Sequence, residues 1–75
     1  MDEELLIEEI SHQEELLRIQ RRHLRAIEIQ VAKHGPLDVP LHIQGARDEL
    51  REEIARIERT LRDLRTRLRR IKRKP

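Results

Sequence analysis

The sequence predicts an all-α fold in which two long helices, at about residues 2–34 and 39–73, form an antiparallel coiled-coil hairpin. The 75 residues include no aromatic residue and 43% charged residues, a composition typical of long helices. Leucine and isoleucine recur with helical spacing in both halves, and one run of turn-forming residues separates them. A single domain of this size buries a small core. We therefore expect the hairpin to assemble into a larger helical bundle.

The first helix is predicted from a heptad pattern. Apolar and amide residues are spaced alternately by four and three residues, as in a coiled-coil seam, at Leu6, Ile10, Gln13, Leu17, Gln20, Leu24, Ile27 and Val31. Acidic residues near the start complement the positive end of the helix dipole. Gly35 is expected to end this helix in the left-handed αL conformation, which glycine adopts readily.

The turn between the helices is predicted at residues 35–38, and Gly35, Pro36, Asp38 and Pro40 define it. Asp38 or Val39 is expected to cap the second helix near residue 39, because proline is tolerated only in the first turn of a helix. Gly45 costs about 1 kcal/mol in a helix interior. A restart of the second helix between Gly45 and Asp48 therefore stays open.

The second helix has a strict heptad seam at Ile43, Arg47, Leu50, Ile54, Ile57, Leu61, Leu64, Leu68 and Ile71. When the chain folds back at residue 37, the numbers of facing residues sum to about 74, and each a-type position faces a d-type position. The polar residues Gln13, Gln20 and Arg47 would set register or oligomer state. The predicted hairpin core is Leu6, Ile10, Leu17, Leu24, Ile27, Val31, Ile43, Leu50, Ile54, Ile57, Leu61, Leu64 and Leu68.

Charge is distributed in four blocks that also favour an antiparallel hairpin. Residues 1–15 contain seven acids and no Lys or Arg, whereas residues 59–75 contain nine bases and one acid. Residues 16–33 are net basic and residues 34–58 net acidic. Each block faces its opposite in the hairpin, whereas a parallel self-dimer would bring like charges together.

The same register predicts how charges meet beside the seam. On one side it pairs Glu9 with Arg67 and His23 with Glu53. On the other side it brings Glu14 near Glu58 and Arg21 near Arg51, which are pairs of like charge. These pairs of like charge predict that another chain binds along the second side.

The first helix also carries a second seam, at the c and g positions beside the core seam: Leu5, His12, Leu16, Ile19, His23 and Ala26. It makes part of the helix apolar over a wider arc than one partner helix covers. One interpretation is an ordinary broad stripe beneath the second helix. Because that helix has only a narrow seam, we interpret the second seam as the candidate oligomer interface of a homo-oligomer.

The basic segment from Arg62 to Lys74 has two interpretations. It would bind nucleic acid or an anionic membrane through phosphate attraction, or it would pair with the acidic start of the first helix and complement its own helix dipole. We favour the second, because the net charge is only +2 and no aromatic residue is present to stack on a base.

Catalysis, metals and cofactors have little support. His12, His23 and His34 recur every eleven residues, which separates neighbours by about 16 Å along a helix, too far for one metal ion. His34 and His42 flank the turn without further ligands beside them. Cysteine is absent and the hydroxyls are only those of Ser11, Thr60 and Thr66. We expect no enzyme activity, no metal, no cofactor and no small-molecule substrate. Protonation of His12 and His23 would disfavour packing at the second seam.

The sequence indicates a soluble chain. No apolar run approaches the roughly 20 residues that span a bilayer. The acidic start is the opposite of the basic start of a signal peptide, and the absence of cysteine is compatible with a reducing compartment. We expect a cytoplasmic location.

One stretch resembles a known class of module. It contains Arg21-Arg22-His23-Leu24, the turn from Lys33 to Leu41, and the segment from Arg47 to Glu58. This pattern resembles short coiled-coil helical hairpins, adaptor-like or effector-associated, of bacterial signalling and conflict proteins with NACHT/STAND-type NTPase, caspase-like or TIR domains. Those hairpins often have Tyr-Gly at the turn, where this chain has His34-Gly35. The resemblance implies association with related hairpins in a sensor or effector protein, and no catalytic residue.

Overall fold

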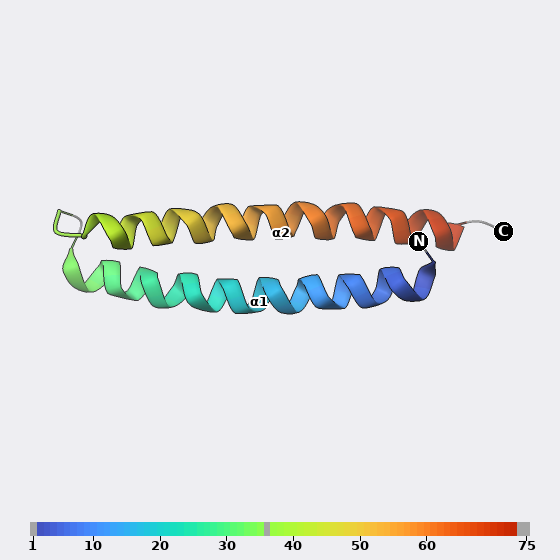
Figure 1. The fold of residues 1–75 in the computed structure, drawn as a ribbon, viewed down its shortest axis with the longest axis horizontal. Helices are drawn as coiled ribbons and strands as arrows, with labels where there is room; N and C mark the ends of the chain where they lie inside the picture. Colours follow the sequence, from blue (N-terminus) through green and yellow to red (C-terminus); the bar gives the residue numbers. More distant parts are fainter. Residues whose placement is uncertain (1, 36, 74–75) are drawn as a thin grey trace.

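The computed structural model, which describes residues 2–35 and 37–73, consists of two antiparallel helices, α1 (Glu3–His34) and α2 (Leu41–Arg73), joined by a short loop (Figure 1). The helices pack against each other along their length, so the predicted all-α hairpin is confirmed. The Cα positions span 58 × 14 × 14 Å, the dimensions of a rod. The beginning of α1 and the end of α2 lie at the same end of this rod.

Helix α1 begins with a side-chain cap. Asp2 has an extended backbone, with φ −78° and ψ 167°, and its carboxylate accepts a hydrogen bond of 3.0 Å from the Leu5 N–H. Glu3 and Glu4 follow in the first turn, where their charge complements the helix dipole. Aspartate is among the preferred capping residues because its oxygen satisfies an amide that has no partner within the helix. The helix therefore begins at Glu3, one residue after its cap.

Gly35 ends α1 with a positive φ, as expected, but not in the αL conformation. Its φ is 81° and its ψ is 162°, so the chain leaves the helix in an extended direction that is open to glycine alone. The Gly35 N–H donates to the Val31 carbonyl at 3.2 Å, and the Asp38 N–H donates to the Gly35 carbonyl at 3.4 Å. These bonds close the turn over residues 35–38. Pro36 lies outside the described residues.

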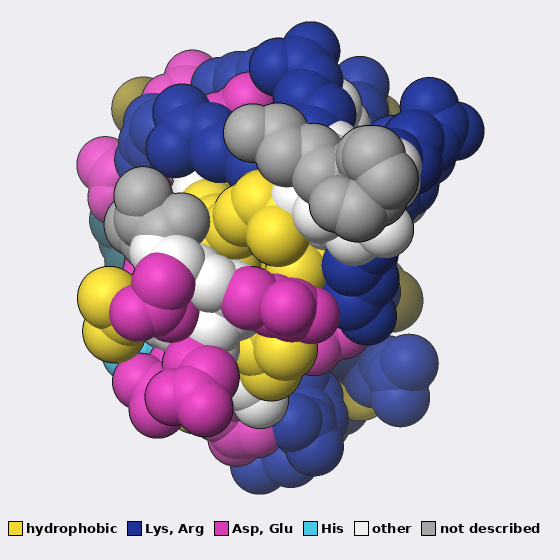
Figure 2. Space-filling view, turned by 90° about the vertical axis from the view of Figure 1, so that its right-hand side faces the viewer, with side chains coloured by type: hydrophobic (Ala, Val, Ile, Leu, Met, Phe, Trp, Pro, Cys, Tyr) yellow, Lys and Arg dark blue, Asp and Glu magenta, His cyan; other side chains and the backbone are white. Residues whose placement is uncertain are grey.

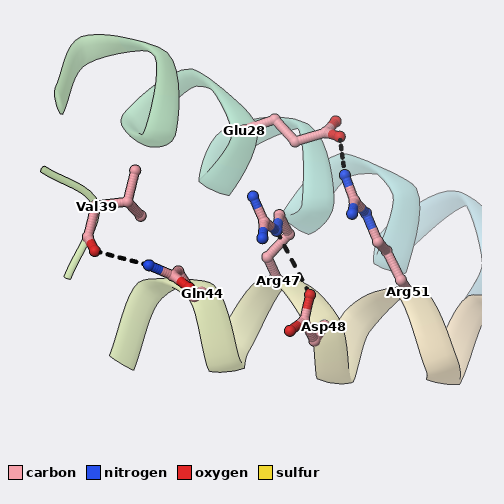
Figure 3. Close-up of polar contacts among 6 residues, drawn as sticks. All are labelled: Glu28, Val39, Gln44, Arg47, Asp48 and Arg51. Carbon is pink, nitrogen blue, oxygen red and sulfur yellow. Dashed lines mark hydrogen bonds and ion pairs between the residues drawn. The ribbon is translucent and has the colours of Figure 1, made fainter. Parts of the chain in front are cut away.

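Helix α2 begins at Leu41, two residues later than predicted, and Pro40 rather than Asp38 or Val39 immediately precedes it. The Pro40 carbonyl accepts hydrogen bonds of 3.1 Å from the Ile43 and Gln44 N–H groups. Proline suits this place because its missing N–H would be unpaired there in any case. The Gln44 side chain donates to the Val39 carbonyl at 2.9 Å (Figure 3). The helix then continues through Gly45, so the restart left open by the sequence does not occur.

The two glycines are expected to respond in opposite ways to alanine. Gly35→Ala forces a side chain into a glycine-only conformation and should destabilise the hairpin by about 1–3 kcal/mol. Gly45→Ala adds a methyl group within a helix and should stabilise it by roughly 0.5–1 kcal/mol. Apart from the adjoining residues and the backbone of the same helix, no atom of the described residues lies within 4 Å of the Cβ that either substitution would add, so neither effect includes a clash with the rest of the hairpin. Urea unfolding followed by circular dichroism measures both variants. If both variants changed the free energy of unfolding in the same direction, the result would contradict the backbone conformation of Gly35.

The core is tightest in the half of the hairpin away from the turn. Leu6, Ile54, Ile57, Leu61 and Leu64 are buried. The other predicted core residues are half-buried, as seam residues of a two-helix structure are when no third layer covers them: Ile10, Leu17, Leu24, Ile27, Val31, Ile43, Leu50 and Leu68. Four of the five buried residues come from α2, whose narrow seam is covered by the broader apolar arc of α1.

Arg47 occupies a seam position in the looser half, near the turn. Its side chain is 25% exposed and its Nε is buried without a hydrogen-bond partner, while Asp48 Oδ1 lies 3.6 Å away (Figure 3). A buried N–H without a hydrogen bond costs about 1–3 kcal/mol. Arg47 therefore weakens the packing next to the turn.

Replacing Arg47 with leucine should stabilise the hairpin. The substitution removes the unpaired donor and continues the leucine and isoleucine seam of α2. Replacing fully buried charges in other proteins stabilises by about 1–4 kcal/mol, and because the Arg47 side chain is 25% exposed, we expect a gain near the lower end of that range. The thermal midpoint should rise, and light scattering should show whether the mass also changes. An unchanged or lower midpoint would mean that the guanidinium is better solvated than its position indicates.

Candidate functional site: two flanks of the hairpin

Two long flanks run beside the core seam, and they differ in chemistry. In α1 the core residues occupy heptad positions a and d. At about 100° per residue, the e positions lie to one side of the seam and the c and g positions lie to the other. We call the side with the e positions of both helices the basic flank. The opposite side contains the second seam of α1.

Three ion pairs connect the helices along the basic flank. Arg65 Nη2 lies 3.1 Å from Glu14 Oε2, Arg21 Nη2 lies 3.5 Å from Glu58 Oε2, and Arg51 Nη2 lies 3.4 Å from Glu28 Oε2 (Figure 3 shows the last pair). Each pair is seven residues further along α1 than the one before it. All three join opposite charges, so the predicted clashes of Glu14 with Glu58 and Arg21 with Arg51 are wrong.

The direction of the side chains explains this difference. Every Cα–Cβ bond in a helix tilts toward the N-terminus of that helix. In an antiparallel pair, Arg21 and Glu58 therefore lean toward each other, whereas Arg21 and Arg51 lean apart. Position numbers alone gave the wrong partner because they ignore this tilt. The like charges on this flank are no reason to expect another chain there.

These ion pairs select the register more than they stabilise the fold. All six side chains are roughly half exposed, and solvent-exposed pairs of this kind contribute about 0–1 kcal/mol each. A shift of one helix by a few residues would lose all three pairs together. Their regular heptad spacing therefore favours one antiparallel alignment over its neighbours.

On the opposite flank, the predicted contacts between the helices are replaced by contacts within each helix. Glu9 accepts a hydrogen bond of 3.0 Å from Gln13, and Arg67 pairs with Asp63 at 3.2 Å. His23 Nδ1 lies 3.2 Å from Gln20 Oε1. Glu53 pairs with Arg56, and its hydrogen bond and charge raise the pKa of that guanidinium. Neither Glu9 and Arg67 nor His23 and Glu53 form an ion pair.

The second seam lies on the outside of α1. Leu5 is 53% exposed and Ile19 is 37% exposed. Leu16 is half-buried, and His12, His23 and Ala26 are exposed. The α2 residues at the g positions on this side are Ala46, Glu53, Thr60 and Arg67, which are small or polar. The apolar surface here thus belongs mainly to α1, and α2 leaves much of it open to solvent.

The basic end of α2 is only partly paired with the acidic start of α1. Between Arg62 and Arg73, Arg65 pairs with Glu14 and Arg67 pairs with Asp63. Within residues 2–35 and 37–73, no ion pair involves Glu3, Glu4 or Glu8 of α1. Figure 2 shows Lys and Arg side chains across the top and along the right-hand side of the end view, and acidic side chains at its centre and lower left. Lys74 lies outside the described residues.

The histidines around the turn do not form a cluster of ligands. Among the described residues, no group of three or more His, Asp or Glu side chains is placed to hold a metal ion. Neither described helix has a stretch that is both long and apolar enough to cross a membrane.

The basic flank shows what reasoning from the sequence missed. The second seam was visible as a pattern of leucine, isoleucine and histidine, but the flank was assigned the wrong partners. The direction of side chains along an antiparallel pair would have been sufficient to find Glu14–Arg65, Arg21–Glu58 and Glu28–Arg51.

A comparison of the chain with protein-family models, curated proteins and solved structures found no match.

Proposed function

We propose that the hairpin is a non-enzymatic protein–protein interaction module that self-associates through the second seam of α1. The observation that carries this proposal is the row of exposed or half-buried side chains at heptad spacing, in which Leu5, Leu16 and Ile19 are the large apolar residues. A helix that is apolar on two adjacent seams buries both when it belongs to a bundle of more than two helices. A second hairpin supplies the missing layer.

The charge along α1 favours a second copy that packs antiparallel to the first. Residues 1–15 contain seven acids and no Lys or Arg. Residues 16–33 contain one acid, Glu28, and five bases: Arg18, Arg21, Arg22, Arg25 and Lys33. Two α1 helices related by a two-fold axis near residues 17 and 18 place the acidic half of each against the basic half of the other. A parallel pair places like charges together.

The heptad spacing of the second seam defines an alignment for this pair. When Leu16 faces Ile19 of the partner subunit, Ile19 also faces the partner's Leu16, as two-fold symmetry requires. His12 then faces His23 of the partner subunit. Beside this layer, Glu15 leans toward Arg22 of the partner subunit, because side chains tilt toward the N-terminus in both helices. Arg22 has no ion pair among the described residues of one chain, so it is available for this contact.

Mass in solution and one distance test the proposal. Size-exclusion chromatography with light scattering at tens of micromolar should give a mass near twice the 9.1 kDa of one chain. A spin label at Ile29→Cys should give a distance between labels of about 35 Å, since 23 helical rises of ~1.5 Å separate the labels along an antiparallel pair. A mass of one chain at all concentrations would refute self-association. A label distance below about 20 Å would keep self-association and overturn the antiparallel arrangement.

The resemblance at the turn extends this proposal to an adaptor role. Paired hairpins would hold sensor or NTPase domains and effector domains of a bacterial signalling or defence protein close together, in the cytoplasm. The support is the stretch from Arg21 to Glu58, including the turn from Lys33 to Leu41. When the hairpin is fused to a reporter enzyme that is active only as a dimer, the fusion should be enzymatically active. Reporter activity that does not require the second seam would argue against the adaptor role.

A further inference from the structure

We propose that the basic flank is a binding site for the phosphate backbone of duplex nucleic acid, separate from the second seam and formed by both helices. The site is a chain of shallow depressions that share residues. The first depression, of about 490 Å³, shares Arg21 and Arg65 with the second. The second depression shares Arg62 and Arg65 with the third. The three depressions therefore form one continuous groove beside the seam.

Cations from both helices line this groove. α1 contributes Arg18, Arg21, Arg22 and Arg25. α2 contributes Arg62, Arg65, Arg69 and Lys72. The acids that line it are Glu14 and Glu58, and each is already paired with an arginine across the groove. The small net charge of the chain hides a strongly positive flank.

Half of these cations are free to bind an external anion when Arg22 pairs with the partner subunit as proposed above. Among the described residues, no ion pair involves Arg25, Arg62, Arg69 or Lys72. Arg69 donates to the Thr66 hydroxyl at 3.2 Å. From the level of Arg25 to the level of Lys72 the groove runs for about 35 Å, at ~1.5 Å per residue, which is close to one turn of a DNA duplex. This spacing suits a linear polyanion better than a single small anion.

The chemistry of the groove favours a duplex over single strands and membranes. The chain contains no aromatic residue, so exposed bases have no side chain on which to stack. The apolar residues that line the groove, Leu17, Leu61 and Leu68, are buried or half-buried in the core seam. A helix that binds a membrane surface inserts an apolar face into the lipid, whereas the apolar residues of this groove pack between the two helices. Contacts would be to phosphates and therefore independent of base sequence.

Fluorescence anisotropy with a 20-base-pair DNA duplex tests the site. The full chain should bind at 50 mM salt and should bind about a hundredfold more weakly at 200 mM salt, if about four phosphates are contacted. The triple variant Arg25→Gln, Arg62→Gln, Arg69→Gln removes three exposed cations of the basic flank. Its affinity at 50 mM salt should fall by at least about tenfold, and the slope of affinity against salt should decrease.

A matched variant on the opposite flank provides the control. Arg56→Gln, Arg67→Gln, Arg70→Gln removes the same total charge from residues outside the groove, and it should change the affinity less than about threefold. Equal losses in the two triple variants would overturn the site, since binding would then follow net charge alone. Absence of binding by the unaltered chain at 50 mM salt would also overturn it. So would tighter binding to vesicles containing phosphatidylserine, at equal phosphate concentration, than to the duplex.

Discussion

Replacing Leu16 and Ile19 with glutamate is expected to convert the self-associated hairpin into single chains of 9.1 kDa. In the proposed pair each of these residues faces the other across the two-fold axis, so two substitutions place four carboxylates in the central layer. Burial of a leucine or isoleucine contributes roughly 1.5–3 kcal/mol, and the carboxylates add repulsion. The dissociation constant should therefore rise by at least about a hundredfold.

Both helices should remain folded in this double variant. Ile19 is 37% exposed and Leu16 is half-buried, and neither belongs to the buried core. Circular dichroism should show nearly unchanged helicity, while light scattering shows the lower mass. The matched control is Leu37→Glu, Leu41→Glu, which adds the same charge at residues that are 95% and 83% exposed. That control should keep the mass of the unaltered chain. If both variants keep it, the interface lies elsewhere.

Leu61→Ala is expected to have the largest effect on stability. Leu61 is 2% exposed and lies at the centre of the tight half of the core, between Ile57 and Leu64 on α2. Truncation of a buried leucine to alanine costs about 2–5 kcal/mol, because the contacts are lost and the cavity closes only partly. A domain of this size is marginally stable, so the variant should be largely unfolded at 25 °C.

Leu41→Ala is the matched control for Leu61→Ala. It removes the same atoms from a residue that is 83% exposed, and the free energy of unfolding should change by less than about 0.5 kcal/mol. Urea unfolding at one fixed protein concentration compares the two variants, since self-association adds to the measured stability. A similar loss in both would mean that the core is not concentrated around Leu61.

A helix end could be predicted from the sequence where interactions within its own backbone determine it. The end of the first helix was predictable because the requirement for glycine at residue 35 arises within its own backbone. The start of the second helix was predicted two residues early. The Pro40 carbonyl and the Gln44 side chain complete that end, and choosing between Pro40, Asp38 and Val39 required their actual hydrogen bonds. Residue preferences alone do not resolve neighbouring candidates for a cap.

The sequence by itself determined the two helices, their antiparallel packing and the candidate second seam, because heptad periodicity and the turn depend on residue spacing along one chain. Only the tertiary structure decided which charges meet. Glu14–Arg65, Arg21–Glu58 and Glu28–Arg51 form because side chains of opposed helices tilt toward each other. The structure also brought the arginines of α1 beside those of α2 in one groove. Residues that are far apart in the sequence become one surface only when the helices take their places side by side.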